Sequence, residues 1–261
     1  MLINLEGKVS LITGAASGIG KEIAEMFGKS GSNLILADIN KNDLIKVSQK
    51  IERDSKVKVI PLEMDVTNAQ SVRNGVEIAI NETQNIDILV NGAGVSTMDE
   101  IINLSEKDWD YVFDVNAKGV FLVSKYVAQH MIKRASGRII NIASMAGRQA
   151  APFLAHYSAS KFAVIGFTQG LALELAKYKI NVNAICPAFV KTPMQEREIN
   201  WEAQLKGISP EEVRESYIKM TPLGRLETPE DVAKVALFLA SPLSDFITGE
   251  AINVTGGALL Y

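Results

Sequence analysis

A short apolar run leads directly into a glycine-rich turn in the stretch VSLITGAASGIG, residues Val9 to Gly20. An apolar run followed by glycines and the start of a helical pattern is the context in which a glycine motif indicates a dinucleotide-binding turn. Glycines let the backbone approach a pyrophosphate, and the free N–H groups at the start of the next helix favour its negative charge. A simple tight turn is the alternative for a glycine pattern taken alone. The residues expected to contact a nucleotide cofactor are Gly14, Ser17, Gly18, Ile19 and Gly20.

The carboxylate of Asp38 favours the dinucleotide interpretation over a simple turn. Asp38 ends the second predicted strand, 18 residues beyond Gly20, where a carboxylate can hydrogen-bond the hydroxyls of an adenosine ribose. The same carboxylate would repel a 2′-phosphate, and no arginine or lysine stands at Ala15–Ser17 or at Ile39 to receive one. The sequence therefore predicts NAD(H) rather than NADP(H), although the nearby Lys41 keeps NADP(H) as an alternative.

Short apolar runs alternate with longer amphipathic stretches along the whole chain. The runs are apolar throughout, which is typical of strands in a sheet that is covered on both faces. This β-α rhythm predicts one α/β domain over residues 1–261, a Rossmann-type doubly wound parallel sheet of about seven strands with ligands at the carboxyl ends. The predicted strands are Val9–Thr13, Asn33–Ala37, Val57–Pro61, Ile86–Val90, Gly137–Ile142, Ile180–Cys186 and Ala251–Val254. The predicted helices include Lys21–Lys29, Lys41–Arg53, Ala69–Glu82, Val120–Arg134 and Tyr157–Lys177.

One segment, residues 188–223, departs from this rhythm. It contains Trp201, three prolines and many charges, and its pattern suggests a helical excursion from the domain. A long insertion after a late strand of a compact domain is more often functional than disordered. We therefore predict that residues 188–223 form a substrate lid.

The composition limits the kinds of partner that this chain can have. With 261 residues, 47% of them hydrophobic, the chain suits one domain with a substantial core. A net charge of -3 provides no basic field for nucleic acid or an anionic membrane, and the single cysteine, Cys186, is typical of a reducing compartment. No signal-peptide pattern or membrane-spanning apolar run is present. We expect a soluble, cytoplasmic protein with no metal, nucleic-acid or membrane partner.

Tyr157 and Lys161 stand four residues apart in the run Tyr-Ser-Ala-Ser-Lys, and Ser144 lies upstream in Ile-Ala-Ser. Residues at this spacing in a helix lie on the same face. A lysine ammonium beside a phenol favours the phenolate, so we expect the pKa of Tyr157 to fall below its ordinary value of about 10. Such a tyrosine can act as an acid and a base near neutral pH. Together with the glycine turn, these residues predict a site that moves a proton and a hydride.

Two further segments follow predicted strands and would reach the same edge of the sheet. Asp65 and Val66 come after the third strand and could border an adenine ring, although a helix cap is an alternative role for Asp65. The run Asn91-Gly92-Ala93-Gly94 ends the fourth strand, and small residues there allow a ligand to lie against the backbone. The cofactor contacts expected from these segments are Asp65, Val66, Asn91, Ala93 and Gly94.

Taken together, these motifs resemble the short-chain dehydrogenase/reductase family over nearly the whole chain. The matching residues are Thr13–Gly20, Asp38, Asn91–Gly94, Asn116, Ser144, Tyr157, Lys161, Pro187 and Thr192. The resemblance implies a catalytic tetrad of Asn116, Ser144, Tyr157 and Lys161. In it, Asn116 would steady a water chain to Lys161, Ser144 would orient the substrate oxygen, and Tyr157 would transfer the proton. Lys161 would also hold the nicotinamide ribose and acidify Tyr157. The family further implies nicotinamide contacts from Pro187, Val190 and Thr192, and a homotetramer.

The substrate pocket is expected between the loop Met145–His156 and residues 188–223. The apolar residues expected in it are Met145, Phe153, Leu154, Phe189, Met194 and Trp201, mixed with the polar Gln149, His156 and Gln195. His156 is interpreted as a pocket wall or a structural contact. Arg148 could bind a phosphate or carboxylate, and a solvated surface arginine is the alternative.

The resemblance also suggests a substrate class. Hydroxybutyrate dehydrogenases of the family carry polar and cationic side chains where this chain has Ser96, Ala146 and Leu154, and reductases of carrier-bound acyl chains typically use NADP(H), which Asp38 opposes. The chain looks most like polyol (sorbitol-type) and acetoin-type dehydrogenases. We therefore predict reversible oxidation of a secondary alcohol. The expected substrate is a sugar alcohol, bound by Ser144 and Tyr157. Acetoin or diacetyl, 3-hydroxyacid and 3-oxoacyl substrates are alternatives, as is a non-catalytic NAD-binding scaffold.

Overall fold

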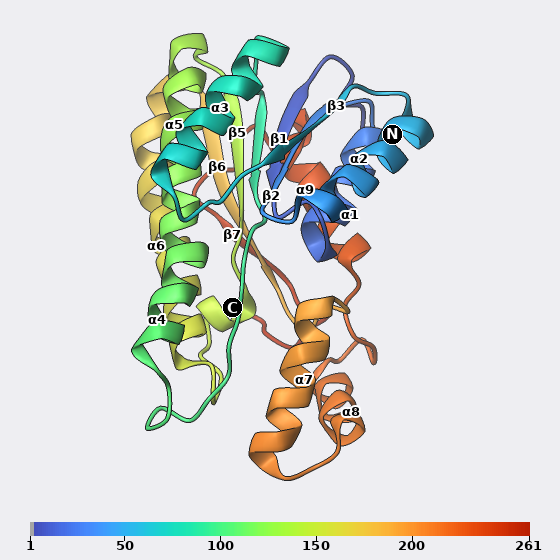
Figure 1. Ribbon diagram of the computed structural model, residues 1–261, viewed down its shortest axis with the longest axis vertical. Helices are drawn as coiled ribbons and strands as arrows, with labels where there is room; N and C mark the ends of the chain where they lie inside the picture. The colour runs from blue at the N-terminus through green and yellow to red at the C-terminus, as the bar shows by residue number, and fades with distance from the viewer. Residues whose placement is uncertain (1–2) are drawn as a thin grey trace.

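Seven parallel strands form the centre of the molecule, in the order β3-β2-β1-β4-β5-β6-β7 (Figure 1). The computed structural model describes residues 3–261. The strands are β1 (Val9–Thr13), β2 (Asn33–Asp38), β3 (Val59–Glu63), β4 (Ile88–Asn91), β5 (Gly137–Ile142), β6 (Ile180–Pro187) and β7 (Ala251–Val254). The chain builds outward from β1 to β3 and then returns to place β4 on the other side of β1. Ligands of such sheets bind at this reversal, outside the carboxyl ends of the strands.

Helices cover both faces of the sheet, as the apolar strands predicted (Figure 1). The helices on one face are α1 (Gly18–Lys29), α2 (Lys41–Ser55) and α9 (Pro229–Ala240). Those on the other are α3 (Ala69–Thr83), α5 (Gly119–Arg134) and α6 (Ala155–Leu175), with α4 (Glu106–Phe113) beside α6. Successive strand residues face opposite helices, since Ile12 packs in the cluster that contains Phe27 of α1, and Leu11 in the cluster that contains Val127 of α5. The α/β Rossmann-type prediction is therefore confirmed.

The element boundaries differ from the prediction by a few residues. Strand β3 begins at Val59 rather than Val57, because its register with β2 starts where Leu34 pairs with Val59. Helix α6 begins at Ala155 and ends at Leu175, two residues earlier at each end than predicted. None of these shifts moves a site residue to another face of the sheet.

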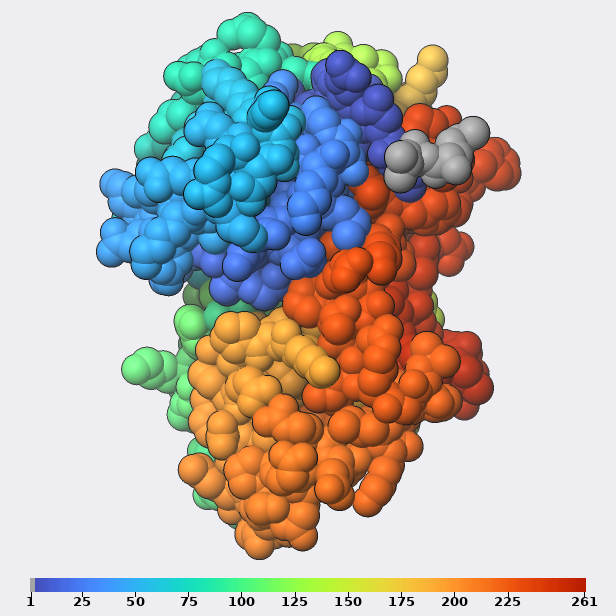
Figure 2. Space-filling view, turned by 90° about the vertical axis from the view of Figure 1, so that its right-hand side faces the viewer, coloured from blue at the N-terminus to red at the C-terminus, as the bar shows by residue number. Residues whose placement is uncertain are grey.

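Residues 188–223 form the predicted helical excursion. Its two helices are α7 (Pro193–Lys206) and α8 (Pro210–Met220), which extend beyond the carboxyl ends of the strands (Figure 1). In Figure 2 this orange segment forms the part of the molecule that lies below the blue N-terminal residues. Thr192 caps α7, and a capping box of Ser209 and Glu212 begins α8. The excursion has a small apolar core of its own, formed by Ile199, Ala203, Val213, Tyr217 and Leu226.

Two kinds of feature are missing from residues 3–261. No helix there combines the length and the apolar character needed to cross a membrane. Nor do those residues contain a group of three or more His, Cys, Asp or Glu side chains arranged to hold a metal ion.

Candidate active site

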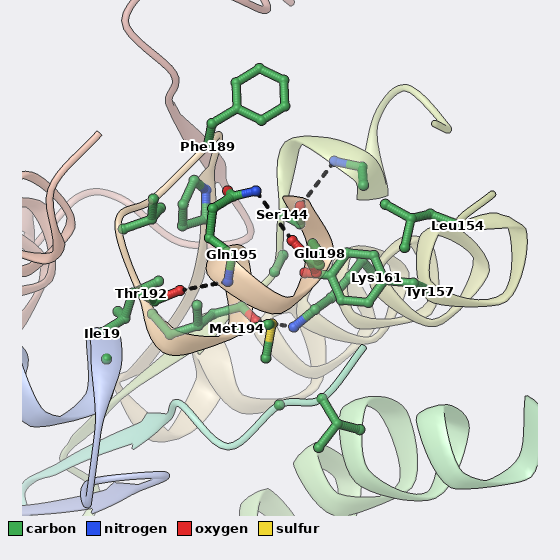
Figure 3. Close-up of a pocket in the computed structure, with 18 of the residues that line it drawn as sticks. Ile19, Ser144, Leu154, Tyr157, Lys161, Phe189, Thr192, Met194, Gln195 and Glu198 are labelled. Atoms are coloured by element: carbon green, nitrogen blue, oxygen red, sulfur yellow. Dashed lines mark hydrogen bonds between the residues drawn. The ribbon is translucent and has the colours of Figure 1, made fainter. Parts of the chain in front are cut away.

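A cavity of about 790 Å³ opens at the carboxyl ends of the strands and continues to the inner side of α7 and α8. Figure 3 shows the part of it that contains Ser144, Tyr157 and Lys161. The predicted site residues that line this one cavity are Gly14, Ser17, Gly18, Ile19, Gly20, Asp38, Asp65, Val66, Ala93, Gly94, Ser144, Tyr157, Lys161, Pro187, Val190 and Thr192. The fold thus brings together residues that are far apart in the sequence, from the turn after β1 to the start of α7.

The glycine turn is packed too closely for side chains. Gly14 has a φ of +68°, and a Cβ there would lie 2.7 Å from the backbone of Ala93. A Cβ on Gly20 would collide with the Gly14 carbonyl oxygen. Among the described residues, Ser17 makes no side-chain capping bond to α1, so the first N–H groups of that helix are available to an anionic ligand. These features fit the pyrophosphate of a dinucleotide.

Asp38 is held in a fixed orientation at the end of β2. Its two carboxylate oxygens accept hydrogen bonds from the backbone N–H groups of Ala16, at 3.0 Å, and Asn40, at 2.9 Å. Lys41, the cation that kept NADP(H) as an alternative, pairs with Glu63 on β3 at 3.1 Å. The neighbouring Ile39 is apolar and 69% exposed at the cavity. The charge at this end of the cavity therefore favours a ribose diol over a phosphate.

After β3 the structure excludes the alternative role of Asp65, which lines the cavity, and after β4 it corrects the position expected for Asn91. Asp65 does not cap a helix: its Oδ1 accepts hydrogen bonds from the N–H and hydroxyl of Thr67, and Asn68 is the N-cap of α3. Asn91 does not line the cavity, because its buried amide donates to Ser124 at 2.9 Å and to Asn141 at 2.8 Å. Of the predicted run Asn91–Gly94, the small residues Gly92, Ala93 and Gly94 line the cavity.

Asn116 lies beneath the cavity rather than in its wall. It is fully buried in a π-helical turn, Asp114–Lys118, that joins α4 to α5. Its amide Nδ2 donates to the Val95 carbonyl at 2.9 Å and to Ser160 Oγ at 3.1 Å, and its Oδ1 accepts from the Val95 N–H at 2.8 Å. Asn116 therefore fixes the loop after β4 against α6. π-Helical turns of this kind often occur at functional sites.

Tyr157 and Lys161 project from one face of α6 into the cavity (Figure 3). Lys161 Nζ donates to the Ile142 carbonyl at 2.9 Å and lies 5.7 Å from the centroid of the Tyr157 ring. Ser144 begins the short turn after β5, and its Oγ accepts from the Ala146 N–H at 3.1 Å. A phenol, an ammonium and a hydroxyl thus meet where a carbonyl or carbinol oxygen could lie.

Burial controls the protonation of this pair. Burial raises the pKa of Tyr157 above its ordinary value, the charge of Glu198 raises it further, and hydrogen bonding by Ser144 lowers it. Burial lowers the pKa of Lys161 to about 8. The sequence expectation that Lys161 lowers the pKa of Tyr157 is therefore wrong for the chain itself, because Nζ lies over the ring and is bonded to Ile142, and desolvation of the phenolate dominates.

Sequence reasoning missed the acidic side chains on the inner face of α7. Glu198 and Glu202 line the cavity beside the predicted Gln195, and Glu198 lies beside Tyr157 in Figure 3. The signal was present in the sequence, because spacings of three and four residues place side chains on one helical face. By contrast Trp201, which was expected in the pocket, does not line it.

His156 and Arg148 also lie outside the cavity. His156 is fully buried and its Nε2 is 2.7 Å from Thr97 Oγ1, so the structural-contact interpretation is confirmed. Arg148 donates a hydrogen bond to the Ala251 carbonyl and lies near the buried Cys186 thiol, whose pKa is raised by burial and lowered by Arg148. It is therefore neither a pocket cation nor a solvated surface residue. The cations that line the cavity among the described residues are Lys161, Arg197 and Lys206.

Comparison with known proteins places these features in a family context. The sequence profile described as short chain dehydrogenase matches residues 8–203. The 3-oxoacyl-acyl-carrier-protein reductase of Thermotoga maritima is 41% identical over 99% of this chain and 100% of its own length. The galactitol 2-dehydrogenase of Agrobacterium fabrum is 40% identical over 98% of each chain. A crystal structure of NAD+-bound xylitol dehydrogenase is 32% identical and matches with a TM-score of 0.94 over 97% of this chain and 99% of that one.

Proposed function

Because the chain belongs to the short-chain dehydrogenase family, we propose that it catalyses the NAD(H)-dependent, reversible oxidation of a secondary alcohol in a sugar alcohol or related polyol to the ketone. In general terms, the chain is an oxidoreductase that acts on CH–OH groups. The observation that carries the proposal is that Tyr157, Lys161 and Ser144 line the same cavity as Asp38. The polyol class is supported by the galactitol and xylitol dehydrogenase relatives and by the polar inner face of α7.

The residues around the cavity fit NAD(H). The turn Gly14–Gly20 would hold the pyrophosphate, Asp38 the adenosine ribose, and Lys161 the nicotinamide ribose. Val190 and Thr192 would contact the carboxamide. When bound, NAD+ supplies the acceptor for the hydride that leaves the carbinol carbon.

The proposed proton path uses only side chains of this chain. Ser144 Oγ would orient the substrate oxygen, and the Tyr157 oxygen would take its proton. Tyr157 and Lys161 titrate together: loss of one proton from the pair gives either phenol with amine or phenolate with ammonium, at the same net charge. Since burial lowers the pKa of Lys161 to about 8, the pair gains a base as the pH rises through that value. Asn116, through Val95 and Ser160, would keep the floor of the site in place.

A second candidate function is reduction of a 3-oxoacyl group on a carrier. The 41% identity to the Thermotoga maritima reductase supports it. Asp38, which disfavours NADP(H), and the carboxylates of α7, which disfavour an anionic substrate group, count against it.

A substrate panel separates the two candidates. Galactitol, xylitol, sorbitol, butane-2,3-diol, 3-hydroxybutyrate and a 3-oxoacyl thioester would each be followed at the nicotinamide absorbance with NAD(H) and NADP(H). We expect the highest kcat/KM for a neutral polyol with NAD+. A higher kcat/KM for the thioester than for every polyol would contradict the polyol proposal and favour the second candidate.

We also propose that residues 188–223 close over the bound substrate. Helix α7 contributes Met194 and Gln195 to the cavity wall, and Gly207, with a φ of +66°, joins it to α8. The base of the segment is anchored, because the backbones of Phe189 and Lys191 both bond to Glu227 at 2.9 Å. Lids of this kind exclude water and complete a site.

Amide hydrogen exchange tests this lid. Exchange in residues 195–207 should be fast in the free protein and should slow when NADH and a substrate analogue are added, because closure protects the helix. Met194→Ala should raise KM for the alcohol, whereas Trp201→Ala, on the same helix but outside the cavity wall, should leave it unchanged. Identical exchange with and without ligands would mean that the segment is not a lid.

The predicted homotetramer has a candidate surface on α5 and α6. Phe121, Phe162 and Leu173 are 43%, 46% and 82% exposed on these helices, and Phe121 meets Phe167 edge to face, with ring centroids 6.2 Å apart. Exposed apolar side chains in such a group favour association. Light scattering should give the mass of four chains, and Leu173→Glu should reduce it. A monomer mass for the unmodified protein would exclude this assembly.

A further inference from the structure

Three glutamates on α7 have different partners. Glu196 points to the outside and forms a two-pronged ion pair with Arg214, both contacts 2.9 Å long. Glu202 is buried between the Tyr217 hydroxyl, which donates to it, and the Lys206 ammonium. Glu198, between them, receives only a long hydrogen bond of 3.4 Å from Gln195 Nε2 among the described residues. The fold therefore satisfies Glu196 and Glu202 but leaves most of the hydrogen-bonding capacity of Glu198 free.

This unused carboxyl lies at the reacting end of the cavity. Glu198 lines the cavity beside Tyr157, and its charge acts on both Tyr157 and Lys161 (Figure 3). Burial raises the pKa of Glu198 above that of an ordinary carboxyl group, and the Lys161 ammonium lowers it. A group in this position costs free energy to bury unless it finds a hydrogen-bond partner.

A second buried polar group, the Ser96 hydroxyl, lies near Glu198. Ser96 is 5% exposed, and its Oγ makes no well-formed hydrogen bond with another residue among residues 3–261. Ser96 Oγ, in the loop after β4, acts as a hydrogen-bond donor that lowers the pKa of Glu198, so the two side chains lie near each other. Buried polar groups are normally satisfied, and a carboxyl group left mostly unpaired beside a reacting centre fits a ligand hydroxyl that bonds to it.

We propose that Glu198 determines the substrate specificity of this enzyme by accepting a hydrogen bond from a substrate hydroxyl next to the carbinol that Tyr157 deprotonates. The inference rests on the proposed function and adds to it a required feature of the substrate, a vicinal hydroxyl. It also makes the site reject substrates with a carboxylate or phosphate at that position, because such a group would face Glu198. Among the described residues, two cations line the cavity besides Lys161. Lys206 is paired with Glu202, and the exposed Arg197 is paired with no glutamate among residues 3–261.

Three four-carbon alcohols isolate the two parts of this proposal. Butane-2,3-diol has the neighbouring hydroxyl, butan-2-ol lacks it, and 3-hydroxybutyrate carries a carboxylate on the same side of the carbinol. In the unmodified enzyme kcat/KM should be highest for the diol. Glu198→Gln should lower kcat/KM for the diol by about tenfold, because a charge-assisted hydrogen bond becomes a neutral one. The same change should raise kcat/KM for 3-hydroxybutyrate, so that the ratio of the two falls by on the order of 10²-fold.

The pH dependence gives a readout that a structural role would not change. The titratable and charged groups near Glu198 are Tyr157 and Lys161 from α6, Arg197 and Glu202 from α7, and Tyr217 from α8. Both substrates use Tyr157 and Lys161, so their titration cancels in the ratio of kcat/KM for diol and hydroxy acid. This ratio should rise with pH in the unmodified enzyme, as Glu198 loses its proton, and should be flat in Glu198→Gln.

Glu196→Gln is the matched control, since Glu196 lies on the same helix outside the cavity. It should leave all three kcat/KM values unchanged. Calorimetric titration of the NAD+ complex with acetoin and with acetoacetate repeats the comparison without turnover, so it remains informative if the proposed polyol oxidation fails. Equal kcat/KM for diol and butan-2-ol, or equal preference for acetoin over acetoacetate in Glu198→Gln and the unmodified protein, would overturn the role of Glu198.

Discussion

Replacement of Tyr157 by phenylalanine should lower kcat for alcohol oxidation by on the order of 10³-fold, within the range for loss of a general acid–base group. The change removes only the hydroxyl. The ring stays beneath Lys161, whose Nζ remains bonded to the Ile142 carbonyl. NADH binding, measured by fluorescence titration, should therefore be nearly unchanged. A variant with substantial turnover would disprove the assignment of Tyr157.

Lys161→Ala provides the comparison, because Lys161 has two proposed roles. Its removal should weaken NADH binding as well as turnover, whereas Tyr157→Phe should affect turnover alone. In the unmodified enzyme, alcohol oxidation should increase with pH through about 8, since burial lowers the pKa of Lys161 to that value and the pair needs to lose one proton to act as a base. An activity that falls as the pH rises from 7 to 9 would contradict this pairing.

The parts of the fold that depend on local sequence could be predicted closely. The run VSLITGAASGIG forms a strand, a glycine turn and the start of α1 because each step depends on near neighbours: apolar side chains fit a buried strand, and only glycine fits at Gly14 and Gly20. Asp38 could be placed at the end of β2 because the apolar run stops there. The spacing of Tyr157 and Lys161 placed both on one face of α6.

The parts that depend on tertiary packing could not be predicted in this way. The pKa of Tyr157 is raised rather than lowered because the surrounding elements remove water from it, which no local pattern reveals. Asn91 turns into the protein because Ser124 and Asn141, far away in the sequence, accept its amide. The orientation of α7, which brings Glu198 rather than Trp201 to the cavity, is set by the packing of that helix on α8.

The cofactor preference should change with Asp38. In the unmodified enzyme kcat/KM for NAD+ should exceed that for NADP+ by on the order of 10²-fold or more, because charge-assisted hydrogen bonds to the ribose diol are each worth about 1.5–3 kcal/mol and a 2′-phosphate would meet the same carboxylate. Asp38→Asn keeps the shape and removes the charge. It should therefore weaken NAD+ use while relieving most of the repulsion of NADP+. Equal use of both cofactors by the unmodified enzyme would sink this assignment.

The double change Asp38→Ala with Ile39→Arg should go further and reverse the preference towards NADP(H). Ile39 is 69% exposed at the cavity, so an arginine can project there without displacing the core, and its guanidinium can pair with the 2′-phosphate through two hydrogen bonds. Ile39→Arg alone is the control, because Asp38 would still repel the phosphate and should limit the gain. Asp38 also accepts the N–H groups of Ala16 and Asn40, so Asp38→Ala frees two backbone donors next to the glycine turn. Thermal unfolding would measure that structural cost separately. A double variant that stays folded and still prefers NAD+ would show that contacts other than the Asp38 carboxylate select the cofactor.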